Sequence, residues 1–187
     1  GAIGLDHVTM QNCTYGTYVT GTGAVTAVDC LFSTNTYGMR QSGGSLALGS
    51  TTFSANTTDG VRCEGVAPVI TDASVAFDGN DTGLRIEDVA DLMLDSAMTF
   101  TGHEVVGLHL IDCENATIDN QTFTGNQGTH GAILVDDGGE FELGSGNTIG
   151  GAGLENTHPL AIGAGAYASA TSTIPSTGNL DASIRVA

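Results

Sequence analysis

The sequence predicts an all-β fold, a solenoid in which three short strands recur in every repeat of a 187-residue chain. Three columns of residues carry this prediction: a glycine that opens an apolar alternation, a large apolar residue that is mostly phenylalanine, and an asparagine three positions later. The composition agrees, because 28 glycines and many threonines favour turns and strands. We therefore expect little or no α-helix.

The first column is a glycine followed by apolar residues in alternation. These glycines are Gly16, Gly38, Gly60, Gly83, Gly107 and Gly131, with steps of 22, 22, 23, 24 and 24 residues. A glycine at a fixed place in each repeat is typical of a sharp turn into a strand, where a side chain would be disfavoured. The alternation that follows predicts one strand in each repeat.

The second and third columns are predicted to form the interior of the solenoid. The large residues are Met10, Phe32, Phe53, Phe77, Phe100 and Phe123, and three positions after them stand Cys13, Asn35, Asn56, Asn80, His103 and Asn126. Stacked coils would bring the phenylalanines into ring-to-ring contact and the asparagines into a hydrogen-bonded structural ladder. We expect His103 to take the place of asparagine in that ladder.

Another alternating apolar stretch completes each repeat, for example Val25–Val28, Leu46–Leu48 and Ala116–Ile118. Three short strands cannot bury an apolar face alone, whereas coils stacked at the ~4.8 Å strand spacing pair their main-chain groups with the next coil. The repeat therefore predicts a parallel β-solenoid of six to seven coils, each about 23 residues long, over residues 1–153. Residues 154–187 lose the period and are expected to form a C-terminal capping or fold-back tail.

This pattern of Gly-apolar-x-apolar, a strand ending in Phe and an Asn in the next turn resembles the repeat of right-handed parallel β-helices of the pectate-lyase-like superfamily. The resemblance covers about Leu5 to Gly153 and implies a right-handed coil. Its motifs are specific for the fold and say little about function.

Enzymes of that superfamily degrade polysaccharides, and this chain departs from both of their patterns. The hydrolases use clustered aspartates with Gly-His-Gly and Arg-x-Lys motifs, whereas this chain has the pair Asp136 and Asp137 but no Gly-His-Gly and no lysine. The lyases combine calcium-binding carboxylates with a cationic base. An arginine paired with a glutamate stays protonated and is a poor base, and the nearly constant repeat length leaves no long loops to build a cleft.

Two outward columns on one face are the candidate ligand-binding site. Counting from the glycines, the first column reads Tyr18, Arg40, Arg62, Arg85, His109 and Ile133, and the second includes Glu64, Glu87, Ile111 and Val135. The charges either pair across coils as a surface ladder or form a groove for a glycan or a carboxylated ligand. The candidates are Tyr18, Arg40, Arg62, Arg85, His109, Glu64 and Glu87.

Other side chains offer weaker signals. Asp95 and Asp119 stack as like charges, so they are either solvated acids or a calcium site, the one cofactor that we consider. The spacing of the cysteines (Cys13, Cys30, Cys63 and Cys113) predicts four free thiols. The apolar residues Ile111, Ile133 and Val135 would form an outward stripe, which the tail is expected to cover.

The strongly negative net charge of the chain limits the classes of molecule that it can bind. With four arginines, no lysine and a net charge of −17, the chain should repel nucleic acid, and its short apolar runs exclude membrane insertion. We expect a non-catalytic structural or adhesive module, extracellular or at the cell surface: a stalk, an adhesin or a filament subunit. Because the first coil begins without a cap, end-to-end self-association or continuation in a longer chain is expected. The alternative is a protein that binds or degrades carbohydrate through the arginine columns.

Overall fold

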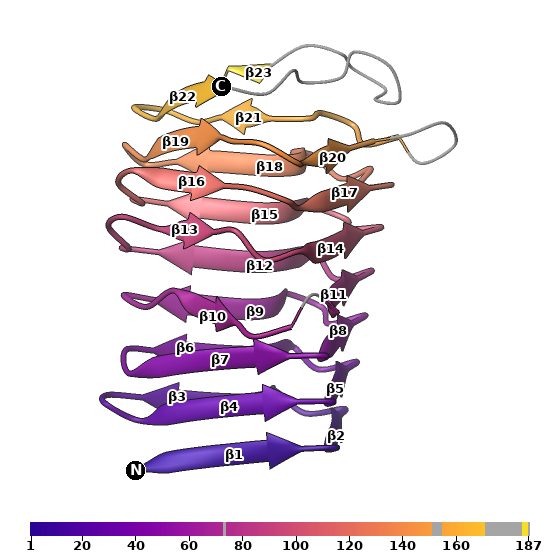
Figure 1. The fold of residues 1–187 in the computed structure, drawn as a ribbon. Coiled ribbons are helices and arrows are strands. Elements are labelled where there is room, and N and C mark those ends of the chain that lie inside the picture. Colours follow the sequence, from indigo (N-terminus) through magenta and orange to yellow (C-terminus); the bar gives the residue numbers. More distant parts are fainter. Residues whose placement is uncertain (73, 151–154, 171–184, 187) are drawn as a thin grey trace.

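The chain winds into a stack of about seven coils, and the described part contains no helix. The computed structural model describes residues 1–72, 74–150, 155–170 and 185–186. Each complete coil contributes three short strands, which lie directly above the strands of the previous coil (Figure 1). All the pairings are parallel. The predicted all-β solenoid is therefore confirmed.

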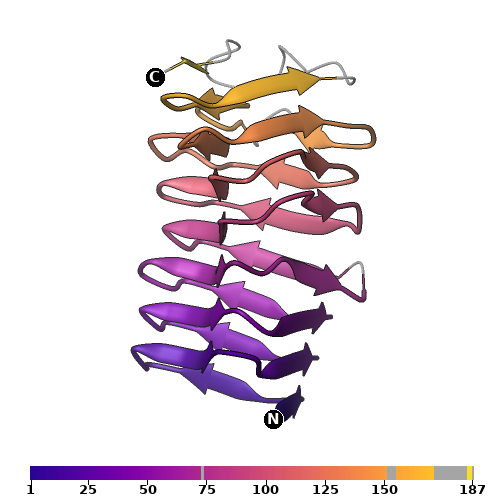
Figure 2. The same cartoon turned by 90° about the vertical axis from the view of Figure 1, so that its left-hand side faces the viewer.

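The strands form three faces. An eight-stranded sheet contains β3 (Tyr15–Thr20), β6 (Tyr37–Ser42), β9 (Asp59–Glu64), β12 (Thr82–Glu87), β15 (Val106–Ile111), β18 (Gly131–Asp136), β21 (Ala161–Ile162) and β23 (Arg185–Val186). A seven-stranded sheet contains β2 (Thr9–Gln11), β5 (Leu31–Ser33), β8 (Thr52–Ser54), β11 (Val75–Asp78), β14 (Met98–Thr101), β17 (Thr122–Thr124) and β20 (Thr148–Ile149). Figure 2 shows the coils from the side, each resting on the one before.

The third face is divided into two four-stranded sheets. The first contains β1 (Ala2–Asp6), β4 (Ala24–Val28), β7 (Ser45–Gly49) and β10 (Pro68–Ile70). The second contains β13 (Met93–Leu94), β16 (Ala116–Ile118), β19 (Glu140–Leu143) and β22 (Tyr167–Ala170). Strands β10 and β13 do not pair, so this face has a break where the other two sheets are continuous.

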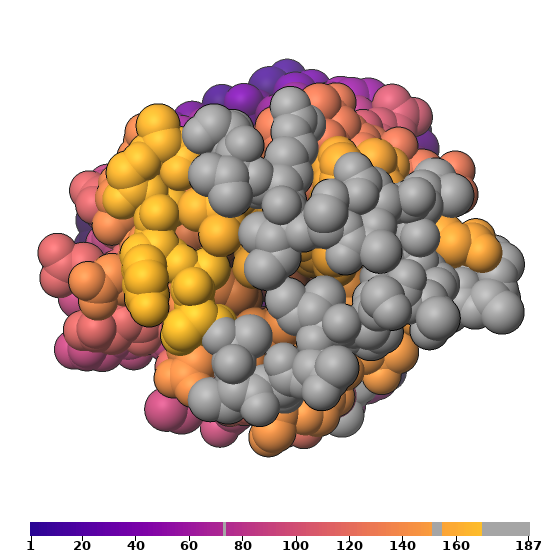
Figure 3. Space-filling model, turned by 90° about the horizontal axis from the view of Figure 1, so that it is seen from above, coloured from indigo at the N-terminus to yellow at the C-terminus, as the bar shows by residue number. Residues whose placement is uncertain are grey.

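The coils continue beyond the expected boundary at residue 153. Strand β21 pairs with β18, and β22 pairs with β19 in parallel register. Figure 3 looks onto this end of the stack, where the described residues of the last strands are yellow. Residues 155–170 therefore add another layer to two of the sheets, while residues 154, 171–184 and 187 of the predicted tail lie outside the described residues.

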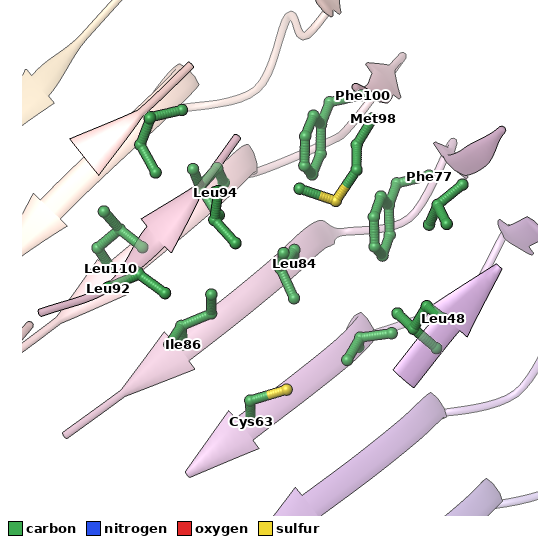
Figure 4. Close-up of a cluster of buried hydrophobic side chains, with 14 of the residues drawn as sticks. Leu48, Cys63, Phe77, Leu84, Ile86, Leu92, Leu94, Met98, Phe100 and Leu110 are labelled. Atoms are coloured by element: carbon green, nitrogen blue, oxygen red, sulfur yellow. The ribbon is translucent and has the colours of Figure 1, made fainter. Parts of the chain in front are cut away.

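The phenylalanine column forms an interior stack. Phe32, Phe53, Phe77, Phe100 and Phe123 are fully buried, and successive ring centroids are 5.1, 5.2, 4.9 and 4.7 Å apart. Their main chains are direct partners in the sheet, so the rings overlap coil after coil. Figure 4 shows Phe77 and Phe100 beside the aliphatic side chains of the core, among them Leu84 and Leu94. Residues at the same position in successive repeats therefore stack directly on one another along the axis of the solenoid.

The asparagine column forms the predicted ladder. The main-chain N–H of Asn35 donates to Asn56 Oδ1 and that of Asn56 donates to Asn80 Oδ1, both at 3.0 Å. His103 continues the series by accepting from the Asn80 N–H through Nδ1 at 3.2 Å. Asn126 and then Asn156 extend it, the latter beyond the predicted repeats. The ladder pairs polar groups that would otherwise be buried without partners.

The alignment of β18 predicted from Gly131 is wrong by one residue. Gly131 pairs with Val106, and Ile133 pairs with Leu108, so Ala132 takes the place of the repeating glycine. Ile133 and Val135 are consequently buried, and there is no outward apolar stripe for the tail to cover. The segment between Asn126 and this strand is longer than in other repeats. Because strand side chains alternate, a shift of one residue exchanges the two faces.

The cysteines are all free, as predicted. Cys30, Cys63 and Cys113 are buried, and Cys13 is exposed at the first turn. Within the described residues, none of the elements is a helix that could span a bilayer.

Candidate functional site

The predicted charged columns lie on the outer surface of the eight-stranded sheet, which we name the arginine face. Strand register places Tyr18, Arg40, Arg62, Arg85 and His109 one above another in β3, β6, β9, β12 and β15. Ser42, Glu64, Glu87 and Ile111 form the neighbouring column. The structure therefore brings together all seven of the predicted ligand-binding residues, although β18 contributes Leu134 and Asp136 in place of Ile133 and Val135.

The arginines and glutamates are joined in a continuous ladder of ion pairs. Glu64 Oε1 lies 2.8 Å from Arg40 Nη2 in the coil before it and 2.8 Å from Arg62 Nε in its own strand. Glu87 repeats the arrangement, because it pairs with Arg62 Nη2 at 3.0 Å and with Arg85 Nε of its own strand. Each glutamate thus bridges two coils.

Partial burial strengthens this ladder. The side chains of Glu64 and Glu87 are 21% and 13% exposed. Burial alone would raise the pKa of Glu87, but hydrogen bonds and charge from Arg85, with a further contribution from Arg62, lower it. Burial likewise opposes the charge on Arg40, yet its bonds to Glu64 and Tyr15 raise the Arg40 pKa. Both shifts favour the charged forms of Glu87 and Arg40.

Three tyrosines continue the arginine face toward the N-terminus. The rings of Tyr15 and Tyr18 are stacked at 4.9 Å, and those of Tyr15 and Tyr37 at 5.1 Å. The guanidinium of Arg40 lies over the Tyr18 ring, 5.5 Å from its centroid, in a cation–π contact. The face therefore changes along the stack from aromatic to ionic.

Asp59 is a site residue that the sequence analysis missed. It occupies the same position in β9 as Tyr15 in β3 and Tyr37 in β6, and its side chain is only 1% exposed. Its Oδ2 atom has no hydrogen-bond partner. Burial raises the Asp59 pKa to about 6, although Arg85 and Arg62 oppose the shift. The signal in the sequence was an aspartate just before the glycine, where the other repeats have tyrosine, threonine or valine.

His109 does not join the arginine ladder. Its Nε2 atom lies 3.1 Å from Asp136 Oδ2, which occupies the position where Val135 was expected. Burial lowers the His109 pKa, and the contact with Asp136 opposes that shift. The result is a separate polar pair above the arginines.

Neither Asp95 nor Asp119 belongs to a group of three or more potential metal-ligating side chains among the residues that the structure describes. Asp119 Oδ1 accepts a hydrogen bond from the main-chain N–H of Ser145 in the next coil. In the described part of the chain, three potential metal-ligating groups gather at another place, the exposed turn residues Asp6, His7 and Asp29. Calcium at Asp95 and Asp119 stays a prediction.

The buried thiols are poor nucleophiles. Burial strongly raises the pKa of Cys63, and it also raises that of Cys113. Because the thiolate is the reactive form, both are inert at neutral pH.

Comparison with known proteins addresses the fold. No curated protein and no solved structure shows significant similarity to this chain. A family model described as a right-handed β-helix region matches residues 2–180. That match covers nearly the whole chain and agrees with the parallel coils and the predicted handedness. The chain therefore belongs to the right-handed β-helix family.

Proposed function

We propose that this β-helix is a non-catalytic structural or adhesive module of a secreted or cell-surface protein, serving as a stalk, an adhesin or a filament subunit. The observation that supports it best is the arginine ladder. The three arginines available for a substrate on this face are already bound to Glu64 and Glu87, which lie in or next to their own strands.

This engagement argues against catalysis. A lyase or a hydrolase needs a free base or acid beside the bond that it breaks. A ligand carboxylate would have to displace Glu64 or Glu87 from a pair that is already partly buried. The ladder instead joins coil to coil, so its charges stabilise the stack itself.

The interior supports a rigid rod. Seven coils at the strand spacing give a stack about 30 Å long, with the phenylalanine stack and the asparagine ladder running through it. Each coil pairs with its neighbours on several faces at once, so bending the rod would strain several sheets together. End-to-end stacking of such modules, or continuation in a longer chain, would lengthen the rod without a change in design.

Two measurements on the same protein test the proposal. Single-molecule pulling from the two ends should show high mechanical resistance, reduced in Arg62→Gln because the coil-bridging pair with Glu87 and the pair with Glu64 in its own strand are both lost. Incubation with neutral and uronate polysaccharides should release no reducing sugar and no unsaturated uronate. Product release that disappears in Arg62→Gln would contradict the proposal, and so would unfolding at forces no higher than those of a flexible linker.

A second candidate function is glycan binding on the arginine face. The observation that favours it is the half-exposed Tyr18 in its aromatic stack. Sugars commonly stack on exposed aromatic rings. Binding on a glycan array that is lost in both Tyr18→Ala and Arg62→Ala, but retained in the distant Thr117→Ala, would establish this role.

A further inference from the structure

A second surface is unlike the arginine face in both charge and shape. It is the outer side of β10, β13, β16, β19 and β22 with the adjoining turns, and we name it the acidic face. These strands lie one above another in Figure 1. Three hollows open on it, of about 190, 300 and 260 Å³. None of them belongs to the arginine ladder.

The acidic face carries the most exposed large apolar side chains of the described residues. Val69 on β10 is 60% exposed, Met93 on β13 is 65% exposed and Tyr167 on β22 is 66% exposed. Val69 and Met93 line one hollow, and Tyr167 lines another. Val69 and Met93 are therefore close together, whereas Tyr167 lies three coils beyond Met93 and pairs with Glu140. Large apolar groups exposed beside hollows are a feature of binding surfaces.

The charges around these side chains all have one sign. Seven carboxylates line the three hollows: Asp88, Asp91, Asp95, Asp112, Glu114, Glu140 and Glu142. None of the ion pairs among the described residues includes any of them. The chain has no lysine, and all four arginines belong to the eight-stranded sheet. The acidic face therefore lacks internal charge neutralisation.

The break in the third face lies within this surface. Strand β10 ends one four-stranded sheet and β13 ends the other, although β9 pairs with β12 and β11 with β14 in the same coils. Pro68 opens β10 and has no N–H to donate. The two strand edges are thus left at the 300 Å³ hollow between Val69 and Met93.

We propose that the acidic face is a docking surface for a basic, extended polypeptide segment of another protein. The carboxylates would attract its lysines or arginines, and the hollows would take its apolar side chains. From β10 to β22 the face crosses four coil spacings, about 19 Å. An extended segment of about six residues covers that length at ~3.3 Å per residue.

Such a partner would give the rigid module an attachment point. Peptide binding and mechanical resistance are separate measurements, so the docking surface and the proposed structural role can fail independently. The surface is also distinct from the glycan candidate, because the two faces share no residue.

The test uses a fluorescein-labelled hexapeptide in which lysine and leucine alternate, titrated with the whole protein and followed by fluorescence anisotropy. A lysine–serine hexapeptide and a glutamate–leucine hexapeptide serve as comparisons. The proposal expects the lysine–leucine peptide to bind at least fivefold more tightly than the lysine–serine peptide, and the glutamate–leucine peptide not to bind. Amide chemical shifts should move at Val69, Met93 and Tyr167, and not on β6, β9 or β12.

Two double variants separate specific docking from general attraction to an acidic protein. Val69→Ser with Met93→Ser should weaken binding about tenfold, and Glu140→Gln with Glu142→Gln should weaken it at least as much. The matched control is Asp6→Asn with Asp29→Asn, which removes the same charge from a distant turn and should change affinity less than twofold. All of these side chains are at the surface, so unchanged circular dichroism is expected to show an intact fold. Equal losses in the control, or equal affinity for the lysine–serine peptide, would overturn the proposal.

Discussion

Replacing His103 by asparagine should stabilise the protein at neutral pH, because the histidine interrupts a ladder built for asparagine. The main-chain N–H of Asn80 can only donate, so in this bond His103 Nδ1 accepts and the neutral ring carries its proton on Nε2. The Asn80 carbonyl oxygen, 3.1 Å from the same Nδ1, then receives no proton from the ring. The Nε2 nitrogen is buried, and its contact with the Phe77 carbonyl is not a hydrogen bond of normal geometry. An unsatisfied buried donor costs about 1–3 kcal/mol.

An asparagine at this position would remove the unsatisfied donor. Elsewhere in the ladder, Asn56 Nδ2 donates to the Phe32 carbonyl at 3.1 Å and Asn126 Nδ2 donates to the Phe100 carbonyl at 3.0 Å. The equivalent acceptor for residue 103 is the Phe77 carbonyl. The substitution loses the edge contact between the imidazole and Phe100, so we expect a net gain of about 1 kcal/mol at pH 7.

The same substitution should change how stability depends on pH. Burial lowers the His103 pKa from 6.5 to about 4. Because the folded pKa lies below the unfolded one, the stability that comes from the neutral ring is complete above pH 6.5. It is lost as the pH falls toward 4, by about 3 kcal/mol over the window. His103→Asn has no group that titrates there, so it should lack this loss.

Equilibrium denaturation in guanidinium chloride at several pH values between 4 and 7.5 measures both effects. The advantage of His103→Asn over the native chain should grow from about 1 kcal/mol at pH 7 to about 4 kcal/mol near pH 4. A destabilised His103→Asn at pH 7, or a constant difference between pH 4 and 7, would refute the reasoning.

Three other outcomes are expected. Asp59→Asn should be up to about 3 kcal/mol more stable than the native chain at pH 8 and equally stable below pH 4. The reason is that burial raises the Asp59 pKa from 3.8 to about 6. Ionisation of the native Asp59 therefore costs stability as the pH rises through that window. Denaturation curves at both pH values check this, and an unchanged difference would contradict it. Phe77→Ala should lower the free energy of unfolding by about 3–5 kcal/mol, since the ring is stacked on both sides. A decrease of less than about 1 kcal/mol in the same denaturation assay would mean that the surrounding side chains fill the cavity. Alkylation of the native protein with iodoacetamide should modify Cys13 and spare Cys63, as peptide mass spectrometry can show, while the unfolded chain should react at both; equal labelling in the folded state would mean that Cys63 is accessible.

Much of the fold followed from local repetition. The spacing between Phe53, Phe77 and Phe100 and the constant offset to the asparagine were enough to predict coils, because identical units can bury their apolar faces by stacking one on another. The prediction was wrong where the spacing changed. Before β18 the longer segment moved Ile133 and Val135 into the core, and only hydrogen-bond register shows which residue faces inward.

Part of the candidate site could also be predicted from the repetition in the sequence. Arg40, Arg62 and Arg85 recur at equal offsets, so their stacking was predictable, whereas a choice between paired charges and an open groove was not. That choice depends on side-chain distances of about 3 Å between neighbouring coils. Asp59 gave no periodic signal, and its raised pKa comes from burial by neighbours far apart in the chain.

The amino-acid sequence alone determined that this chain is a parallel solenoid with phenylalanine and asparagine inside, because repetition with a period near 23 residues admits few other ways to bury those side chains. The tertiary structure decided which surface charges neutralise each other and which stay unpaired. On the arginine face, Glu64 and Glu87 form ion pairs with the arginines. On the acidic face, the carboxylates have no ion-pair partner among the described residues, and they lie beside exposed apolar side chains and the break in the third face. The two faces differ because the formation of an ion pair depends on the distance between side chains in neighbouring coils, and the amino-acid sequence alone does not give that distance.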